Sequence, residues 1–182
     1  MTLRNTTDRY GSLSIALHWL MVLLMIAVYV FANMIDTYPK GSAGRDLMKT
    51  WHFMIGLTIL ATVLVRIVVT LTSVSPRITP SLPAKQNLAA KGMHFALYAL
   101  MLCLPIAGWL ILSASGKPIP FYGLQLPALI GENKELGRTI KEVHEAGGTI
   151  GYFLIGLHAL AGLYHHYFVK DDTLLRMLPK RG

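Results

Sequence analysis

Cysteine and charge are both scarce in this chain of 182 residues, and each scarcity excludes a class of protein. The single cysteine, Cys103, excludes a disulfide framework and a metal site built from cysteines. Charged residues make up only 14% of the sequence, whereas hydrophobic residues make up 53%. Such a chain is too apolar for an ordinary soluble globular protein. The composition therefore indicates a membrane protein, and the length indicates one domain, residues 1–182.

Two further absences concern organisation. No internal repeat with a period of about 20 to 50 residues is present, so a solenoid or propeller is not expected. The first apolar run has no small-residue cleavage site after it and is longer than the core of a signal peptide, so we expect it to stay in the protein as a membrane span. The net charge of +8 is not read as a nucleic-acid surface, because the basic residues lie in the short segments between apolar runs.

Four apolar runs are long enough to cross a bilayer as helices. We expect spans at about residues 13–34, 47–71, 92–112 and 143–169. Lipid offers no partner to open backbone groups, so the simplest fold is an all-α bundle of four transmembrane helices. The proline-rich segment 72–90 predicts an extended link. The longest link, 113–141, is expected to begin as an apolar, turn-rich stretch against the membrane surface and to continue with helical spacing into the last span.

Lysine and arginine are unevenly divided between the two sides of this bundle. With the N-terminus in the cytoplasm, the inner side holds Arg4, Arg9, Arg66, Arg77, Lys85, Lys91, Lys170, Arg176, Lys180 and Arg181. The outer side then holds Lys40, Arg45, Lys49, Lys117, Lys134, Arg138 and Lys141. The positive-inside rule therefore places both termini in the cytoplasm.

Four of the seven histidines lie in the last expected span. His144 and His158 are 14 residues apart, which returns to nearly the same helix face about 21 Å further along the axis. Gly148 and Gly151 lie between them, so the backbone leaves room for two flat cofactors stacked across the membrane. Ionisable residues inside a span suggest function. Haem is the obvious cofactor because histidine is a standard axial ligand of haem iron.

Depth in the membrane decides which histidines can meet. His18 and His158 both lie toward the cytoplasmic side, and His52 and His144 both lie toward the outer side. We therefore predict two haem irons, one between His18 and His158 and the other between His52 and His144. His94 also lies at cytoplasmic depth and competes for the inner haem. We assign it a structural or quinone-site role because a matched pair is already available.

Other residues would support these haems. Arg66 lies near the inner haem and either binds a haem propionate or extends to the membrane surface; both interpretations stand at this point. Gly56, one turn from His52, would let a macrocycle approach, and Tyr29 would hydrogen-bond near the outer haem. His165 lies at the inner membrane–water boundary, where it either lines a polar pocket or anchors the helix.

Several stretches resemble the bacterial cytochrome b561 family. They are SIALHWLMVLLMIAVY, HFMIGLTIL with the following VRI, MHFALYALMLCLPIAGW and, most specific, GYFLIGLHALAGLYHHYFVKDDTLLRMLPKR. The resemblance covers nearly the whole chain and is greatest to the small members that act as superoxide oxidases (superoxide:ubiquinone oxidoreductases). It implies a multi-pass protein of the bacterial inner membrane with two b haems, bound by His18, His52, His144 and His158.

The resemblance also implies a reaction. Superoxide would give an electron to the outer haem, the electron would pass to the inner haem, and ubiquinone would be reduced with cytoplasmic protons. Lys117 and Arg138 are candidates for attracting the anion, and His165 is a candidate proton donor to the quinone. The wider set of outer cations that could steer superoxide is Lys40, Arg45, Lys49, Lys117, Arg138 and Lys141.

Two alternatives compete with this enzyme. The first is an electron-relay cytochrome b subunit that links the quinone pool to a partner redox enzyme such as a hydrogenase. The modest size of the outer links favours an enzyme that requires no partner protein. The second is a transporter-like bundle without a cofactor, which would need two depth-matched histidine pairs to arise by chance.

Overall fold

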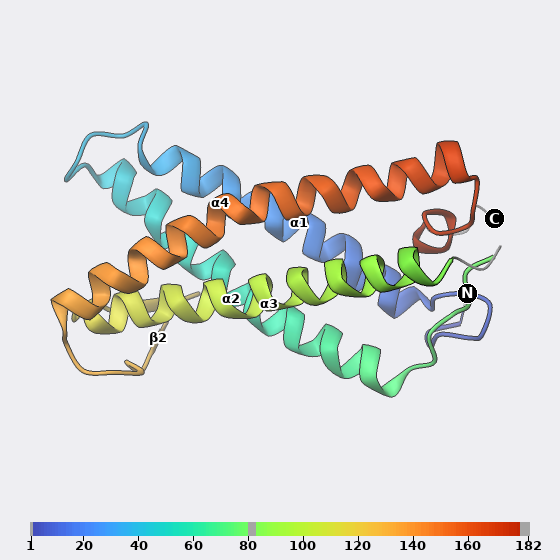
Figure 1. The fold of residues 1–182 in the computed structure, drawn as a ribbon. Helices are drawn as coiled ribbons and strands as arrows, with labels where there is room; N and C mark the ends of the chain where they lie inside the picture. The colour runs from blue at the N-terminus through green and yellow to red at the C-terminus, as the bar shows by residue number, and fades with distance from the viewer. Residues whose placement is uncertain (1, 80–82, 179–182) are drawn as a thin grey trace.

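A computed structural model describes residues 2–79 and 83–178 and shows an elongated bundle of four helices (Figure 1). The helices are α1 (Ser12–Ile35), α2 (Ala43–Thr72), α3 (Ala84–Ala114) and α4 (Lys134–Tyr164). All four are long and apolar enough to cross a membrane, which confirms the predicted fold class. Both ends of the described chain lie at one end of the bundle, which we call the terminal end. The links α1–α2 and α3–α4 lie at the other, the hairpin end.

The helices extend beyond the expected spans. Helix α1 matches residues 13–34 closely, whereas α3 and α4 begin well before residues 92 and 143. The segment 72–90 was predicted to be an extended link, and this is wrong for its second half, which is helical from Ala84. Pro83 precedes the helix, where its missing N–H costs little. Helix α4 begins early because the Asn133 side chain accepts a hydrogen bond from the Leu136 N–H. Pro80, Lys180 and Arg181 lie outside the described residues.

The α3–α4 link folds into a hairpin of β1 (Ile119–Phe121) and β2 (Leu124–Leu126). Its tip, Tyr122 and Gly123, has φ values of 47° and 87°, the pair of positive values that a type I′ turn requires. The Tyr122 hydroxyl is 3.1 Å from the Thr58 hydroxyl of α2. The hairpin therefore packs on the bundle, and the expectation that this stretch lies against the membrane surface stays a prediction.

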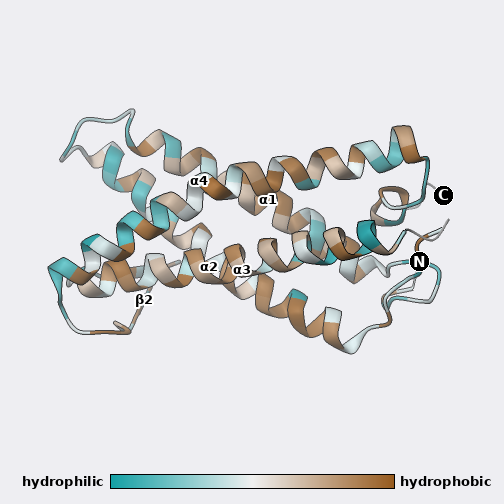
Figure 2. Ribbon diagram, in the orientation of Figure 1, coloured by the Kyte–Doolittle hydropathy of each residue, from teal (hydrophilic) through white to brown (hydrophobic). Residues whose placement is uncertain are grey.

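Apolar packing forms the centre of the bundle. Met21 of α1, Ile55, Ile59 and Val63 of α2 and Met101 of α3 form a buried cluster. Large apolar side chains also cover the outside, and Figure 2 shows apolar residues along the middle of the helices with polar residues gathered toward the ends. Such an exterior is suited to lipid.

The side chain of Tyr29 connects α1 to α4. Its hydroxyl donates to the Gly148 carbonyl at 2.8 Å, and its ring lies 4.3 Å from the Tyr152 ring, centre to centre. A Cβ on Gly151 would overlap the Tyr29 hydroxyl. The expectation that Gly151 leaves room for a cofactor is therefore wrong, since Tyr29 fills that space. Around Gly148 no atom would contact an added Cβ, so the expected opening is present there.

The terminal end is closed by three segments: residues 2–11, 73–79 and 170–178. We call them the terminal cap. Arg176 is only 6% exposed and donates to the carbonyls of Pro76 and Arg77. The Trp19 indole N–H of α1 donates to the Met177 carbonyl at 2.7 Å. The C-terminal tail therefore folds back against the bundle.

Candidate functional site

His52 and His144 face each other at the hairpin end. Their ring centres are 6.1 Å apart and their planes are inclined by 78°. The Nδ1 atom of His52 lies 3.1 Å from the Val28 carbonyl, and that of His144 lies 3.1 Å from the Leu104 carbonyl. A carbonyl only accepts, so each Nδ1 carries the hydrogen and each Nε2 is left with its lone pair. Metal-binding histidines are commonly oriented by such a bond from the other ring nitrogen.

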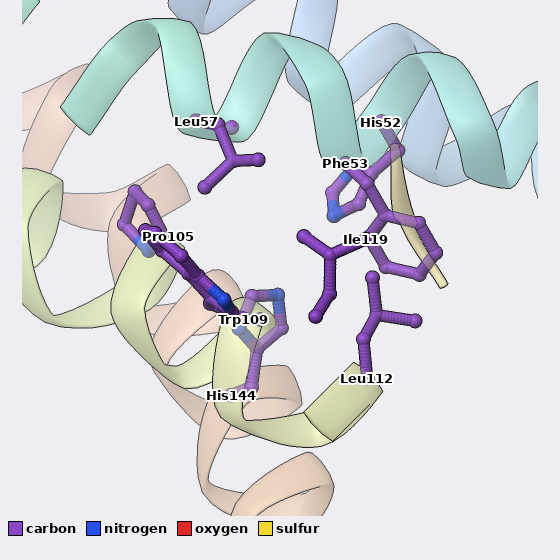
Figure 3. A pocket seen from close by; sticks show the side chains of 10 residues that line it. His52, Phe53, Leu57, Pro105, Trp109, Leu112, Ile119 and His144 are labelled. Carbon is purple, nitrogen blue, oxygen red and sulfur yellow. The ribbon is translucent and has the colours of Figure 1, made fainter. Parts of the chain in front are cut away.

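A cavity lies between these two rings, which enter it from opposite sides (Figure 3). Its other lining residues are almost all apolar: Phe53, Gly56, Leu57, Pro105, Gly108, Trp109, Leu112 and Ile119. A Cβ on Gly56 would meet no atom within 4 Å, as expected for a place where a macrocycle approaches. The Trp109 indole lines the cavity, and its N–H donates to the Pro127 carbonyl at 2.9 Å. Ile119 belongs to β1, so the hairpin forms part of the cavity wall.

The spacing of the rings can be tested against two imidazoles on one iron. A metal–nitrogen bond of about 2.0 Å and roughly 1.1 Å from nitrogen to ring centre place the two centres about 6.2 Å apart. The observed 6.1 Å for His52 and His144, and 6.4 Å for His18 and His158, both fit. The residues present therefore suit two haem groups with two histidine ligands each.

The terminal-end cluster contains a third imidazole. His18 of α1, His94 of α3 and His158 of α4 come together, and His94 lies 5.6 Å from His158. The spacing of the His18 and His158 rings lies closer to the value for a shared iron, but the cluster is not an isolated pair. Arg66 of α2 lies beside it, half-buried, with the Tyr98 ring 5.7 Å from its guanidinium carbon. Within residues 2–79 and 83–178 no carboxylate pairs with Arg66.

His165 has a buried partner that the sequence did not predict. Helix α4 ends in a π-helical turn, His165–Val169, and Lys170 has a φ of 59° that turns the chain back. This turn brings an Asp171 carboxylate oxygen to 2.5 Å from the His165 Nδ1 atom. The Thr173 N–H donates to the other oxygen at 2.9 Å. Residues six apart, such as His165 and Asp171, do not face each other on a regular helix. The sequence could have suggested their contact only if it had shown that the helix ends at Lys170.

The electrostatics of Asp171 follow from these contacts. Burial raises the pKa of its carboxyl, but the hydrogen bonds from His165 and Thr173 outweigh burial and hold the pKa below its usual value of 3.8. Asp171 is therefore a carboxylate at neutral pH, although its side chain has 0% exposure.

The cations at the hairpin end fall into two groups. Some are bound to carboxylates: Arg45 to Asp36, Lys49 to Asp46 and Lys141 to Glu145. Arg45 also donates to the Ile35 and Tyr38 carbonyls and so holds the α1–α2 link. Lys117 and Arg138 are exposed, and in the described part of the chain neither forms an ion pair. Lys117 lines an open cleft beside the hairpin.

The chain is similar to known proteins over nearly its whole length. Residues 9–180 match the family model described as "Prokaryotic cytochrome b561". The chain is 37% identical over 174 residues to "Cytochrome b561 homolog 1" of Escherichia coli (strain K12), covering 96% of this chain and 99% of that protein. It is 38% identical over 174 residues to "Probable superoxide oxidase CybB" of Yersinia pestis, covering 95% and 97%. "Cytochrome b561 homolog 2" of Escherichia coli (strain K12) is 30% identical over 181 residues, covering 99% and 96%.

Members of this family bind haem b and transfer electrons in the bacterial inner membrane, which accounts for paired histidines inside apolar helices. The match to the family model and the full-length similarity to these relatives agree with the four candidate membrane-spanning helices. The chain therefore belongs to the prokaryotic cytochrome b561 family of multi-pass inner-membrane electron-transfer proteins.

Proposed function

We propose that this protein oxidises superoxide at the outer membrane face and delivers the electrons to ubiquinone, with the whole chain, residues 1–182, acting as one di-haem domain. The observation that carries the proposal is the presence of two facing imidazole pairs at opposite ends of one bundle, with ring centres 6.1 and 6.4 Å apart. The similarity to the Yersinia pestis protein named as a probable superoxide oxidase supports the choice of donor.

His52 and His144 would hold the outer haem, and His18 and His158 the inner haem. When bound, the haems supply the one-electron redox chemistry that side chains lack. The Val28 and Leu104 carbonyls orient the outer ligands through Nδ1. We assign Arg66 to a haem propionate rather than to the membrane surface, because a half-buried guanidinium with no carboxylate partner in the described residues needs an anion.

The hairpin end would face the periplasm, and the terminal end the cytoplasm. Superoxide is a small anion, so exposed cations without bound carboxylates are suited to attract it. Lys117 and Arg138 have this character, and Lys117 lies beside the hairpin strand that carries Ile119 into the cavity of the outer pair. Arg45 is less suited because three acceptors already hold its guanidinium.

Ubiquinone would bind near the terminal end, where His165 would donate a proton to it. His165 follows His158 by seven residues, two helical turns further toward the terminal cap. An imidazole can both donate and accept a proton, so His165 could give one to the quinone and regain one from the cytoplasm.

Visible spectroscopy on the purified, oxidised protein tests this function. A superoxide-generating system should reduce the haems, ubiquinone should reoxidise them with formation of ubiquinol, and a dismutase should abolish the reduction. Haems that superoxide leaves oxidised, but ubiquinol reduces, would overturn the proposal in favour of an electron-relay subunit. A protein without a haem spectrum would contradict both functions.

A further inference from the structure

The contact between Asp171 and His165 stands out because a carboxylate without exposed surface is paired with a histidine rather than with a stronger cation. Arg176 is only 6% exposed and lies in the same cap, yet its guanidinium Nε lies 3.3 Å from Asp172. Asp172 also accepts from the Thr79 N–H at 3.1 Å. Asp172 thus joins the parts of the terminal cap, whereas among the described residues the side chain of Asp171 bonds only to His165 and to Thr173, two residues on.

The backbone around this contact is specialised. The helix widens into a π-helical turn at His165, a feature often found at functional sites. Lys170 then adopts a left-handed conformation that is unfavourable for a residue with a side chain. The Asp171 N–H closes the turn by donating to the His165 carbonyl at 3.3 Å. The turn therefore fixes Asp171 against the imidazole.

We infer that Asp171 is a positioning residue for quinone reduction: its carboxylate binds the His165 Nδ1–H and keeps Nε2 available to a quinone carbonyl. The inference rests on the proposed function, since it assumes that quinone is reduced at His165. A carboxylate only accepts hydrogen bonds, so it selects the orientation of the ring and requires the hydrogen to be on Nδ1. The same arrangement orients the histidine in serine hydrolases.

In the proposed step, ubiquinone takes two electrons, which arrive one at a time, and two protons, and becomes ubiquinol. Protonated His165 gives one proton: its Nε2–H bond breaks and an O–H bond forms on the quinone oxygen, which leaves a neutral imidazole beside the Asp171 carboxylate. Water at the cytoplasmic face returns this proton to His165. The second proton also comes from cytoplasmic water, and Asp171 keeps its negative charge throughout.

Stopped-flow measurement of reoxidation by a short-chain ubiquinone tests the inference. The haem-loaded protein is first reduced with dithionite, so the result does not depend on superoxide. Asp171→Asn should lower the maximal rate about tenfold or more, the size expected when the partner of a functional histidine is lost, with little change in the quinone concentration at half-maximal rate. Asp172→Asn is the matched control: it should lower the unfolding temperature and leave the rate unchanged.

A double-mutant cycle separates positioning from a structural role. In a His165→Ala background, Asp171→Asn should cause no further loss of rate, because the group that it positions is gone. If Asp171→Asn folds poorly, Asp171→Glu keeps a carboxylate and should recover part of the rate. Equal losses in the Asp171 and Asp172 variants, or additive losses in the double variant, would overturn the inference. Failure of the unaltered protein to be reoxidised by ubiquinone would instead contradict the proposed function.

Discussion

At the residue scale, Lys117 is an exposed cation at the hairpin end that forms no ion pair in the described part of the chain. Lys117→Glu should slow haem reduction by superoxide severalfold at low salt, because it replaces a cation with an anion. The difference from wild type should shrink as salt rises, since charges beyond about 10 Å are screened at 0.1 M. Stopped-flow rates at several ionic strengths measure this. Lys49→Glu serves as a comparison, because Lys49 already pairs with Asp46 at 3.1 Å, and an equal effect there would argue against a specific role for Lys117.

The lowered pKa of the Asp171 carboxyl predicts how the stability of the protein depends on pH. Its pKa is lower in the folded protein than in the unfolded chain, so the unfolded chain binds the proton more readily. The stabilisation is therefore present above the ordinary carboxyl pKa of about 4 and is lost as the pH falls further. The unfolding temperature should fall between about pH 5 and pH 3, and the fall should be smaller in Asp171→Asn. Parallel curves for the two proteins would show that Asp171 does not contribute.

The histidine pairs could be predicted from the sequence, whereas their surroundings could not. Span boundaries give the depth of each histidine. Depth brings His52 to His144, but at the terminal end it brings His94 as well as His18 to His158. The carbonyls of Val28 and Leu104 that orient His52 and His144 are backbone atoms, and the identity of a residue does not predict a contact of its backbone. Asp171 was missed because its contact depends on one left-handed residue after a π-helical turn.

At the element scale, the contact between α1 and α4 depends on the missing side chain of Gly151. Gly151→Ala should lower the unfolding temperature, because the new methyl group would overlap the Tyr29 hydroxyl and displace its hydrogen bond to Gly148. In a Tyr29→Phe background the same substitution should cost less, since the overlapping atom is gone. Thermal unfolding of the four proteins measures the coupling, and strictly additive effects would contradict it. Gly162→Ala, where nothing lies within 4 Å, is the control.

The helices were easier to predict than the link between α3 and α4. Long apolar runs identify membrane helices strongly, but strands of three residues have too few positions to show alternation. The turn at Tyr122 and Gly123 also lacks the Asn-Gly or Asp-Gly pair that usually indicates a hairpin. The early start of α3 differs from the predicted extended link over residues 72–90. Proline is compatible with a helix that begins directly after it, and Pro83 lies just before the first helical residue.

At the scale of the whole molecule, the proposed function requires both termini to lie in the cytoplasm. A fluorescent protein fused after Gly182 should fold and fluoresce, because such reporters mature in the cytoplasm, and alkaline phosphatase at the same position should be inactive. The expectation follows from the excess of lysine and arginine on that side. An active phosphatase fusion would place the hairpin end in the cytoplasm and remove the assignment of Lys117 and Arg138 to superoxide.

The central claim is that two haems occupy one chain, each dependent on its own histidine pair. Haem content per chain, measured on purified variants, tests it most directly. We expect two haems per chain in the unaltered protein and in His94→Ala. We expect one haem per chain in His52→Ala, in His144→Ala and in the variant with both changes, because His52 and His144 would hold the same haem. One haem in the unaltered protein, or a further loss when His52→Ala and His144→Ala are combined, would contradict the claim.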